Sequence, residues 1–228
     1  MEVKLLQTGP LGVNTVIVPL RENKVFIVDP AACAYCDDEH IISRYMAQNN
    51  LEPVAIVLTH GHFDHVAGLT FLSKTYPDIP IIIHRQDAEM IGADSGRLQG
   101  MMLRQMGFYD FVEAVSNLPE PRAFLEDGMT LADCISSDDN GVKDSLSLWK
   151  VIHTPGHTKG SCCLYNESEK ILISGDTLFY QSWGRTDLYG GSEAEIQQSL
   201  RKLAKTVSKD TRVYPGHEYS GFLFSDNF

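Results

Sequence analysis

The sequence predicts an α/β fold, because segments with the apolar spacing of strands alternate with segments that have the spacing of helices. One apolar run, residues 54–58, lacks polar alternation, which is typical of a strand that is buried on both faces. In addition, four apolar runs each end in a turn of small residues that carries a histidine or an aspartate. In layered α/β proteins such strand ends can meet at one edge of a sheet, where binding sites are usually found.

In the first half of the chain, strands and helices are expected in turn. Strands are expected at residues 15–19, 24–28, 54–58 and 79–84. Helices are expected over about 37–49, 66–76 and 87–115, where apolar residues recur at helical spacing. The last of these regions is rich in methionine, which we interpret as irregular core rather than as an adaptable substrate pocket.

In the second half, strands dominate until one long helix near the end. Strands are expected at residues 130–132, 146–153, 161–165, 170–174 and 211–214, and a helix at 192–207. No linker or low-complexity stretch divides the chain. We therefore expect a single domain that covers residues 1–228, a length sufficient to bury a substantial core.

The composition is that of a globular protein, with 43% hydrophobic and 21% charged residues. The net charge of −11 disfavours a nucleic-acid partner, because phosphate binding usually leaves a basic footprint. The first ten residues lack the apolar core of a signal peptide, and no apolar run approaches the length that crosses a bilayer. These features predict a cytoplasmic protein without a membrane partner, and they leave its oligomeric state open.

The five cysteines are an odd number, which does not suggest a disulfide framework and agrees with a reducing compartment. Cys33 and Cys36 form a lone Cys-x-x-Cys pair. A zinc role for them would require a second ligand pair at matching spacing, and the other three cysteines do not supply one. We interpret the pair as buried or loop thiols, with a redox or zinc role as the alternative.

A cluster of metal-ligand side chains follows the strand expected at residues 54–58. Four such residues lie within six positions: His60, His62, Asp64 and His65. Buried together, the imidazoles would repel one another if protonated and would need partners if neutral, and a divalent cation satisfies both requirements. His60 and His62 share a face of extended chain, while Asp64 and His65 lie at the turn into a helix. One motif can therefore supply two neighbouring metal ions.

Three further strands each end in a turn that carries one candidate ligand: His157, Asp176 and His217. Glycine next to each of these residues lets the backbone turn sharply and approach other groups closely. His153, four residues before His157, is expected to be structural, and His84 is expected either to support the site or to be exposed. Together with the histidine cluster, these turns predict a centre built from five histidines and two aspartates.

The order and context of these seven residues resemble the metallo-β-lactamase superfamily over nearly the whole chain. The resemblance implies a four-layer αβ/βα sandwich with two divalent metal ions at one edge of the paired sheets. It implies that His60, His62 and His157 hold the first metal, that Asp64, His65 and His217 hold the second, and that Asp176 bridges them. Zinc is the expected metal, with iron or manganese as alternatives.

Within the superfamily the chain looks most like the glyoxalase II (hydroxyacylglutathione hydrolase) group, through the motifs at residues 175–179, 184–192 and 216–219. That resemblance implies hydrolysis of a small-molecule thioester, with Arg185 and Tyr219 as substrate-binding candidates. Arg185 could equally pair with Asp187. Glyoxalase II enzymes continue into a helical domain that holds glutathione, whereas this chain ends at Phe228. We therefore expect weak dependence on the glutathione portion.

The expected mechanism follows from the ligands. Two metal ions lower the pKa of a bridging water, so that hydroxide attacks the thioester carbonyl at neutral pH. A metal stabilises the oxyanion that develops. Asp176 and Asp64 are the expected catalytic residues, the first as a bridge between the metals and the second as a candidate proton acceptor.

Two other functions on the same fold remain open at this stage. The first is a persulfide dioxygenase with one iron ion held by His60 or His62, His157 and Asp176. One metal per chain, together with iron and oxygen uptake, would identify it. The second is a non-catalytic metal-binding protein, which is disfavoured because all seven ligand residues are present.

Overall fold

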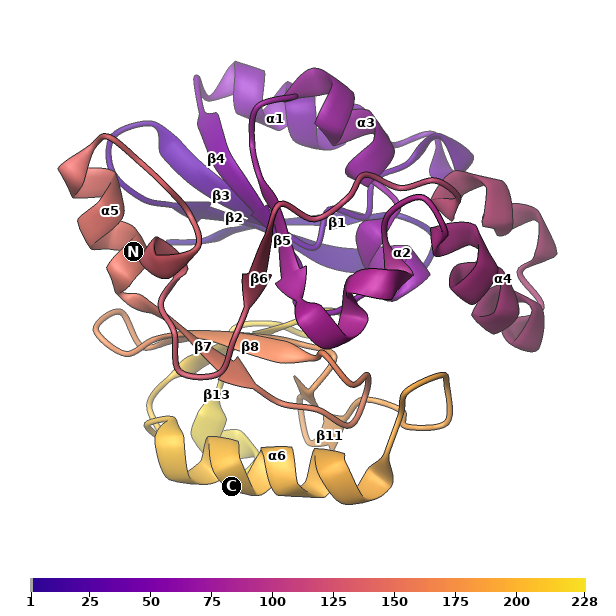
Figure 1. The fold of residues 1–228 in the computed structure, drawn as a ribbon. Helices are drawn as coiled ribbons and strands as arrows, with labels where there is room; N and C mark the ends of the chain where they lie inside the picture. Colours follow the sequence, from indigo (N-terminus) through magenta and orange to yellow (C-terminus); the bar gives the residue numbers. More distant parts are fainter. Residues whose placement is uncertain (1) are drawn as a thin grey trace.

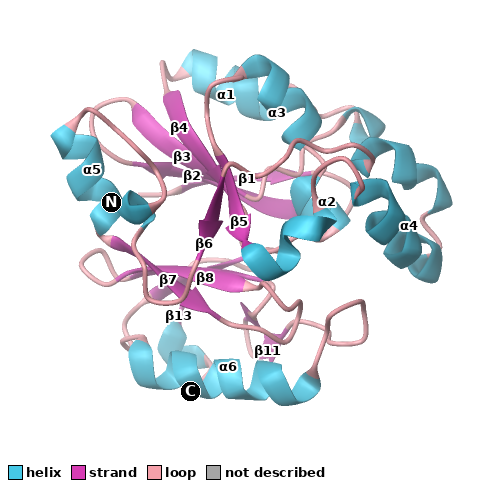
Figure 2. Ribbon diagram, in the orientation of Figure 1, coloured by secondary structure: helices cyan, strands magenta, loops and turns pink. Residues whose placement is uncertain are grey.

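A computed structural model describes residues 2–228 (Figure 1). Two mixed β-sheets face each other in the middle of the molecule, and helices cover their outer faces (Figures 1 and 2). The predicted αβ/βα arrangement of four layers is therefore confirmed. Within the described residues no helix is both long enough and apolar enough to cross a bilayer.

The first sheet has the strand order β1-β2-β3-β4-β5-β6. Its strands are β1 (Lys4–Thr8), β2 (Val13–Pro19), β3 (Lys24–Val28), β4 (Glu52–Val57), β5 (Ile81–His84) and β6 (Ala123–Leu125). The pairs up to β3 are antiparallel, and the pairs from β3 to β6 are parallel. The helices that follow β3 and β4 are α1 (Ile41–Gln48), α2 (Phe63–Val66) and α3 (Leu69–Thr75).

The second sheet has the order β13-β12-β9-β8-β7. Its strands are β7 (Trp149–His153), β8 (Cys162–Asn166), β9 (Ile171–Gly175), β12 (Arg212–Pro215) and β13 (Phe222–Leu223). A separate hairpin pairs β10 (Leu178–Phe179) with β11 (Ser182–Trp183). Helix α6 (Glu193–Thr206) covers the outer face, and the side chain of Ser192 caps its first turn by accepting from the Glu195 amide.

The core between the two sheets is apolar and closely packed. Phe26 of β3 and Trp149 of β7 meet edge to face with ring centroids 5.4 Å apart, so this pair joins the sheets directly. Two other apolar clusters lie under the outer helices, one beneath α1 and α3 and one beneath α6. Each sheet is thus buried on both faces, which agrees with the apolar runs in the sequence.

Three of the expected elements were wrong in kind or extent. In place of the strand expected at 130–132, Thr130 forms an isolated β-bridge with Lys150, and the 3-10 helix η4 (Leu131–Asp133) follows it, because Thr130 and Asp133 form a capping box. The first part of the strand expected at 146–153 is the end of helix α5 (Asn140–Ser147), which Asp139 caps. The helix expected over 87–115 is broken into η2 (Arg85–Met90), α4 (Ser95–Met106) and η3 (Tyr109–Val115), with glycines of positive φ at 92 and 107.

Candidate metal centre

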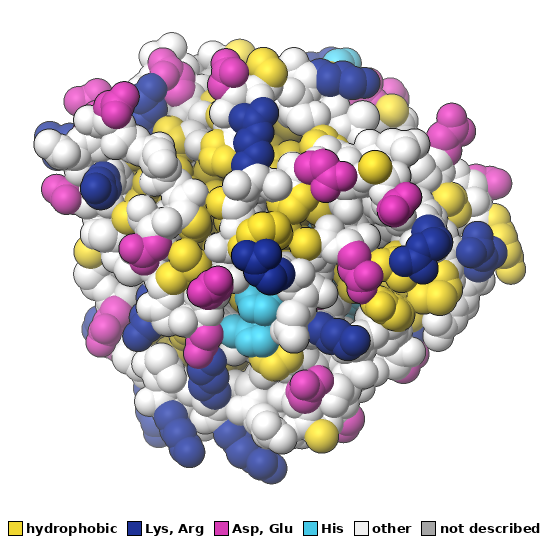
Figure 3. Space-filling model, in the orientation of Figure 1, with side chains coloured by type: hydrophobic (Ala, Val, Ile, Leu, Met, Phe, Trp, Pro, Cys, Tyr) yellow, Lys and Arg dark blue, Asp and Glu magenta, His cyan; other side chains and the backbone are white. Residues whose placement is uncertain are grey.

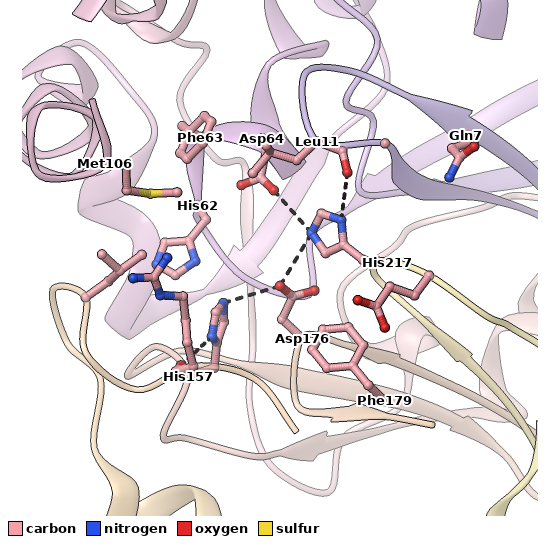
Figure 4. A pocket seen from close by; sticks show the side chains of 14 residues that line it. Gln7, Leu11, His62, Phe63, Asp64, Met106, His157, Asp176, Phe179 and His217 are labelled. Carbon is pink, nitrogen blue, oxygen red and sulfur yellow. Dashed lines mark hydrogen bonds and ion pairs between the residues drawn. The ribbon is translucent and has the colours of Figure 1, made fainter. Parts of the chain in front are cut away.

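All seven candidate ligands lie at one edge of the paired sheets, on the segments that follow four strands. The loop after β4 carries His60 and His62, and helix α2 carries Asp64 and His65. The turns after β7, β9 and β12 carry His157, Asp176 and His217. Five of these residues line a cavity of about 390 Å³ (Figure 4), and the other two, His60 and His65, are buried. The structure therefore brings the predicted residues together.

Three histidines form the first group. The ring centroids of His60, His62 and His157 lie 4.5 to 4.8 Å apart, and one nitrogen of each ring lies within 4.8 Å of the others. The Nε2 atoms of all three rings are buried and have no hydrogen-bond partner among the described residues. Leaving a buried polar atom unpaired costs about 1–3 kcal/mol. A cation bound by three neutral imidazoles would remove this cost, so the group fits a metal ion.

Asp64, His65 and His217 form the second group. His217 Nε2 lies 3.2 Å from Asp64 Oδ2 and 3.1 Å from His65 Nε2. Two imidazole nitrogens facing each other beside a carboxylate are also the donor set of a metal ion such as zinc. His65 is fully buried, so its Nε2 atom can face only the other members of the centre.

Asp176 lies between the two groups (Figure 4). Its Oδ2 atom is 3.6 Å from His157 Nε2 and 3.5 Å from His217 Nε2. Its Oδ1 atom is 3.4 Å from His65 Nε2. One carboxylate thus faces histidines of both groups, as a bridging ligand would.

Burial and charge set the protonation of these side chains. Burial, followed by the neighbouring His157, lowers the pKa of His62 to about 3, so that its ring is neutral at pH 7. Burial also lowers the pKa of His60. At His65 burial opposes the charged form, but Asp176, Asp64 and Asp29 together raise the pKa. His60 and His62 therefore offer lone pairs readily, while the second group holds positive charge between carboxylates until a metal replaces the proton.

Polar groups behind the ligands fix the orientation of three rings. Asp29 accepts hydrogen bonds from the Thr59 amide at 2.7 Å, the Thr59 hydroxyl at 2.6 Å and His65 Nδ1 at 2.9 Å. His157 Nδ1 donates to the Arg185 carbonyl at 2.8 Å, and His217 Nδ1 donates to the Leu11 carbonyl at 3.2 Å. With Nδ1 as the donor, Nε2 of each ring is left free for a metal.

Sequence reasoning missed Asp29, which is buried at the end of β3. Its sequence signal is an aspartate directly after an apolar strand, the same signal that identified Asp176. Asp29 adopts a positive φ of 49°, a conformation that is uncommon outside glycine and aspartate or asparagine. The strained turn aims its carboxylate at Thr59 and His65.

The wall of the cavity differs between the two groups. Phe63 and Met106 line it on the side of His62, and Leu188 is a further apolar residue of the lining. Gln7 and Leu11 line it on the side of His217, and Glu218, the next residue in the chain, also belongs to the lining. Met90 and Met102 belong to the core, as expected for the methionines of this region, whereas Met106 lines the cavity and Met101 is exposed.

The two candidate substrate residues differ in their positions. Arg185 lines the cavity, and its guanidinium binds Asp187 through two hydrogen bonds of 2.7 and 2.8 Å. Tyr219 is 63% exposed, packs edge to face against Tyr180 and is not among the residues that line the cavity. Glu218, which the sequence did not single out, lines the cavity in its place.

The cysteine pair lies in a different place. Cys33, Cys36 and Asp38 gather beside the 3-10 helix η1 (Ala34–Cys36), and none of them lines the metal-site cavity. Both carboxylate oxygens of Asp38 accept from backbone amides, those of Gly9 and Cys33, at 2.7 Å. Burial, followed by Cys36, raises the pKa of Cys33 to about 12. The thiols are thus separate from the histidine centre.

Comparison with known proteins gives related sequences that cover most of the chain. A family model described as the metallo-β-lactamase superfamily matches residues 8–217, a range that includes all seven candidate ligands. An uncharacterized protein of Aquifex aeolicus is 34% identical over 95% of this chain and 90% of its own length. A probable metallo-hydrolase of Bacillus subtilis is 28% identical over 87% and 86%. A hydroxyacylglutathione hydrolase of Pectobacterium carotovorum is 30% identical over 88% of this chain and 59% of that enzyme.

Solved structures with a similar fold also cover nearly the whole chain. The B3 metallo-β-lactamase BLEG-1 has a TM-score of 0.80 and 26% identity, over 99% of this chain and 95% of its own. A protein crystallised in a di-iron-bound form has a TM-score of 0.74 and 28% identity, over 98% and 96%. ETHE1 from Myxococcus xanthus has a TM-score of 0.67 over 99% and 81%, but its 18% identity shows the fold alone.

Proposed function

The chain belongs to the metallo-β-lactamase superfamily and is a metallo-hydrolase, and we propose that its substrate is the thioester of a small 2-hydroxy acid. One observation supports this proposal most strongly. Three buried imidazole nitrogens and one oxygen of Asp176 converge without hydrogen-bond partners among the described residues. Such a set is costly to bury and is suited to hold cations.

We assign the ligands of two metal ions from the two groups of side chains. His60, His62 and His157 would hold the first ion, and Asp64, His65 and His217 the second. Asp176 faces histidines of both groups and would bridge the ions. Nitrogen and oxygen donors suit zinc, iron and manganese alike, and the di-iron form of a relative that is 28% identical makes iron a serious candidate beside zinc.

The side chains of the cavity would each contribute to hydrolysis. Two divalent cations, when bound, lower the pKa of a water molecule and polarise a carbonyl group. Asp176 and Asp64 supply negative charge that holds the cations, and Asp64 is the candidate acceptor for the proton of the attacking water. The apolar side chains of Phe63, Met106 and Leu188 line the cavity and would exclude solvent from the acyl part of the substrate.

The leaving thiol would face a wall with little positive charge. Arg185 is the only lysine or arginine among the residues that line the cavity, and Asp187 already neutralises it. Glu218 and Gln7 also line the cavity. A carrier with two carboxylates, such as glutathione, finds no unpaired cation among these side chains. We therefore propose that the acyl group and the metal centre, rather than the carrier, determine the rate.

A comparison of two thioesters tests this proposal. The value of kcat/KM would be measured for lactoylglutathione and for a lactoyl thioester of a short neutral thiol, with the metal-loaded protein. We expect the two values to agree within about a hundredfold, which is about 2.7 kcal/mol of transition-state binding. A larger preference for glutathione would show that a carrier site exists. The absence of turnover with both thioesters would contradict the proposed function.

The alternative function, a persulfide dioxygenase with one iron ion, uses fewer ligands. The likeness to ETHE1 is too low in identity to bear on activity. Asp64, His65 and His217 would have no role in a mononuclear centre, yet they converge with short contacts of 3.1 and 3.2 Å. This second group favours the hydrolase.

A further inference from the structure

A buried carboxylate outside the ligand set connects the two loops that carry the first group of histidines. Asp87 lies in η2, directly after β5, and is 0% exposed. It accepts hydrogen bonds from the Gly61 amide at 3.1 Å, the Gly160 amide at 2.7 Å and the Thr158 hydroxyl at 2.6 Å. The first donor lies between His60 and His62, and the other two follow His157.

The position of Asp87 leaves little freedom to the two loops. A Cβ atom on Gly160 would lie 2.6 to 2.8 Å from the Asp87 side chain, so the backbone approaches the carboxylate as closely as glycine permits. The two loops also come from different sheets, because one follows β4 and the other follows β7. Asp87 thus joins the sheets at the edge where the histidines meet.

Gly61 is held from its other side as well. The buried Gln99 of α4 donates from Nε2 to the Gly61 carbonyl at 2.7 Å and to the Met90 carbonyl at 2.8 Å. A Cβ atom on Gly61 would lie 2.6 Å from the Cβ atom of Met90. The peptide groups on either side of Gly61 are therefore fixed by η2 and α4, and the directions of His60 and His62 are fixed with them.

The second group of ligands has a different carboxylate behind it. Asp29 contacts His65 directly and holds Thr59, whose hydroxyl lies 3.1 Å from His60 Nδ1, and its hydrogen bonds do not extend to His157 or its turn. Asp87 in turn has no hydrogen bond to the segments of His65 or His217. Asp87 therefore supports the first group alone, whereas Asp29 supports the second group and also reaches His60 through Thr59.

We propose that Asp87 is a positioning residue that sets the distance between the His60–His62 loop and His157, and thereby the affinity of the first metal site. This inference rests on the proposed centre with two metal ions. Loss of Asp87 would leave two backbone amides and a hydroxyl without their acceptor, and the two loops would separate. The first site would weaken, while the second would keep its support from Asp29.

The experiment measures metal binding and not turnover, so its result is independent of the thioester proposal. Cobalt(II) is titrated into the metal-free protein and followed by visible absorption. The His217→Ala background isolates the first site, and the His157→Ala background isolates the second. In the first background we expect Asp87→Asn to weaken cobalt binding about tenfold to a hundredfold, as loss of a group behind a ligand does. In the second background the change should stay within about twofold.

A pair of variants at Thr158 covers the case in which Asp87→Asn fails to fold. Thr158→Ser keeps the hydroxyl that donates to Asp87, whereas Thr158→Val keeps the shape and loses the donor. We expect Thr158→Val to weaken the first site and Thr158→Ser to retain it. Equal losses at both sites with Asp87→Asn, or equal cobalt affinity in the two Thr158 variants, would overturn the inference.

Discussion

At the scale of single residues, the centre gathers buried ionisable side chains, and hydrogen bonds from neighbouring groups fix their orientation. Three of its histidines keep Nε2 free because an oxygen atom accepts from Nδ1, as the Leu11 carbonyl does at His217. The residue types and their spacing predicted the candidate ligands, since few other arrangements place so many imidazoles together. Asp29 and Leu11 could not be predicted in this way, because they act on residues 36 and 206 positions away in the sequence.

The bridging position of Asp176 leads to the first prediction. Asp176→Ala should weaken both metal sites by more than about a hundredfold, beyond the loss expected for a group behind a ligand, and abolish turnover. The reason is that one carboxylate faces histidines of both groups. The metal content after dialysis measures this effect. Asp144→Ala is the control, because it removes the same negative charge at an exposed position. Two retained metals and normal turnover would rule out the bridge.

A stacked pair of histidines leads to a prediction on pH. His84 and His153 lie face to face with ring centroids 4.1 Å apart, one from each sheet. Burial, followed by the charge of His153, lowers the pKa of His84 to about 4, while Asp127 opposes and Arg85 assists this shift. Because the folded pKa is below the unfolded value of 6.5, the unfolded state binds more protons between these limits, and stability falls as pH falls from about 6.5 to about 4.

Urea unfolding at pH 7 and pH 4.5 would measure this effect. His84→Phe keeps the stacked ring without the titration and serves as the reference. The wild type should lose about 1–2 kcal/mol more than this variant on acidification, after allowance for solvent screening. If both proteins lose the same free energy of unfolding on acidification, the pKa of His84 is not lowered in the folded protein.

At the scale of elements, small residues after strands allow the ligands to meet. A Cβ atom on Gly216 would lie 2.2 Å from Asp176 Oδ1 and 2.6 Å from His65 Cε1. The sequence predicted these turns, because glycine beside a candidate ligand is visible without a structure. It did not predict helix α5 or the breaks around α4, since caps and glycines of positive φ decide them and apolar spacing does not. Strands β1 and β6 were missed because their residues do not alternate between apolar and polar types.

The close approach at Gly216 gives a prediction at this scale. Gly216→Ala should weaken metal binding by at least about tenfold, because the new methyl group displaces Asp176 and His65. Gly221→Ala is the matched control, since a Cβ atom there meets nothing within 4 Å although its φ of 81° carries strain. Cobalt titration of both variants separates the two effects. Equal metal affinity in the two variants would show that the turn at Gly216 can shift without weakening metal binding.

At the scale of the whole molecule, two sheets from the two halves of the chain must pack before the centre exists. The fold class could be predicted from alternating elements, and the four layers only through the family resemblance. Acidic and basic side chains are interspersed on the face shown in Figure 3. The net charge of −11 is therefore not gathered into one acidic patch on this face and does not indicate a substrate. The substrate proposal depends instead on the cavity, whose one arginine is paired with Asp187.

The separation of the thiols from the centre gives a prediction for the whole chain. Replacing Cys33 and Cys36 by serine together should leave the metal content unchanged, because neither lines the cavity and both oxygens of Asp38 are already engaged by amides. Elemental analysis of the double variant beside the wild type measures this. Loss of one metal per chain in the variant would assign that ion to the cysteine pair.

The most direct test of the central claim is the number and coordination of the metal ions in the wild-type protein. Elemental analysis after reconstitution with zinc, iron or manganese gives the stoichiometry, and X-ray absorption spectroscopy gives the donor atoms. We predict about two ions per chain, each bound by nitrogen and oxygen without sulfur, because the converging side chains are histidines and aspartates. A stoichiometry that stays near one with every metal, or sulfur among the donors, would contradict the account.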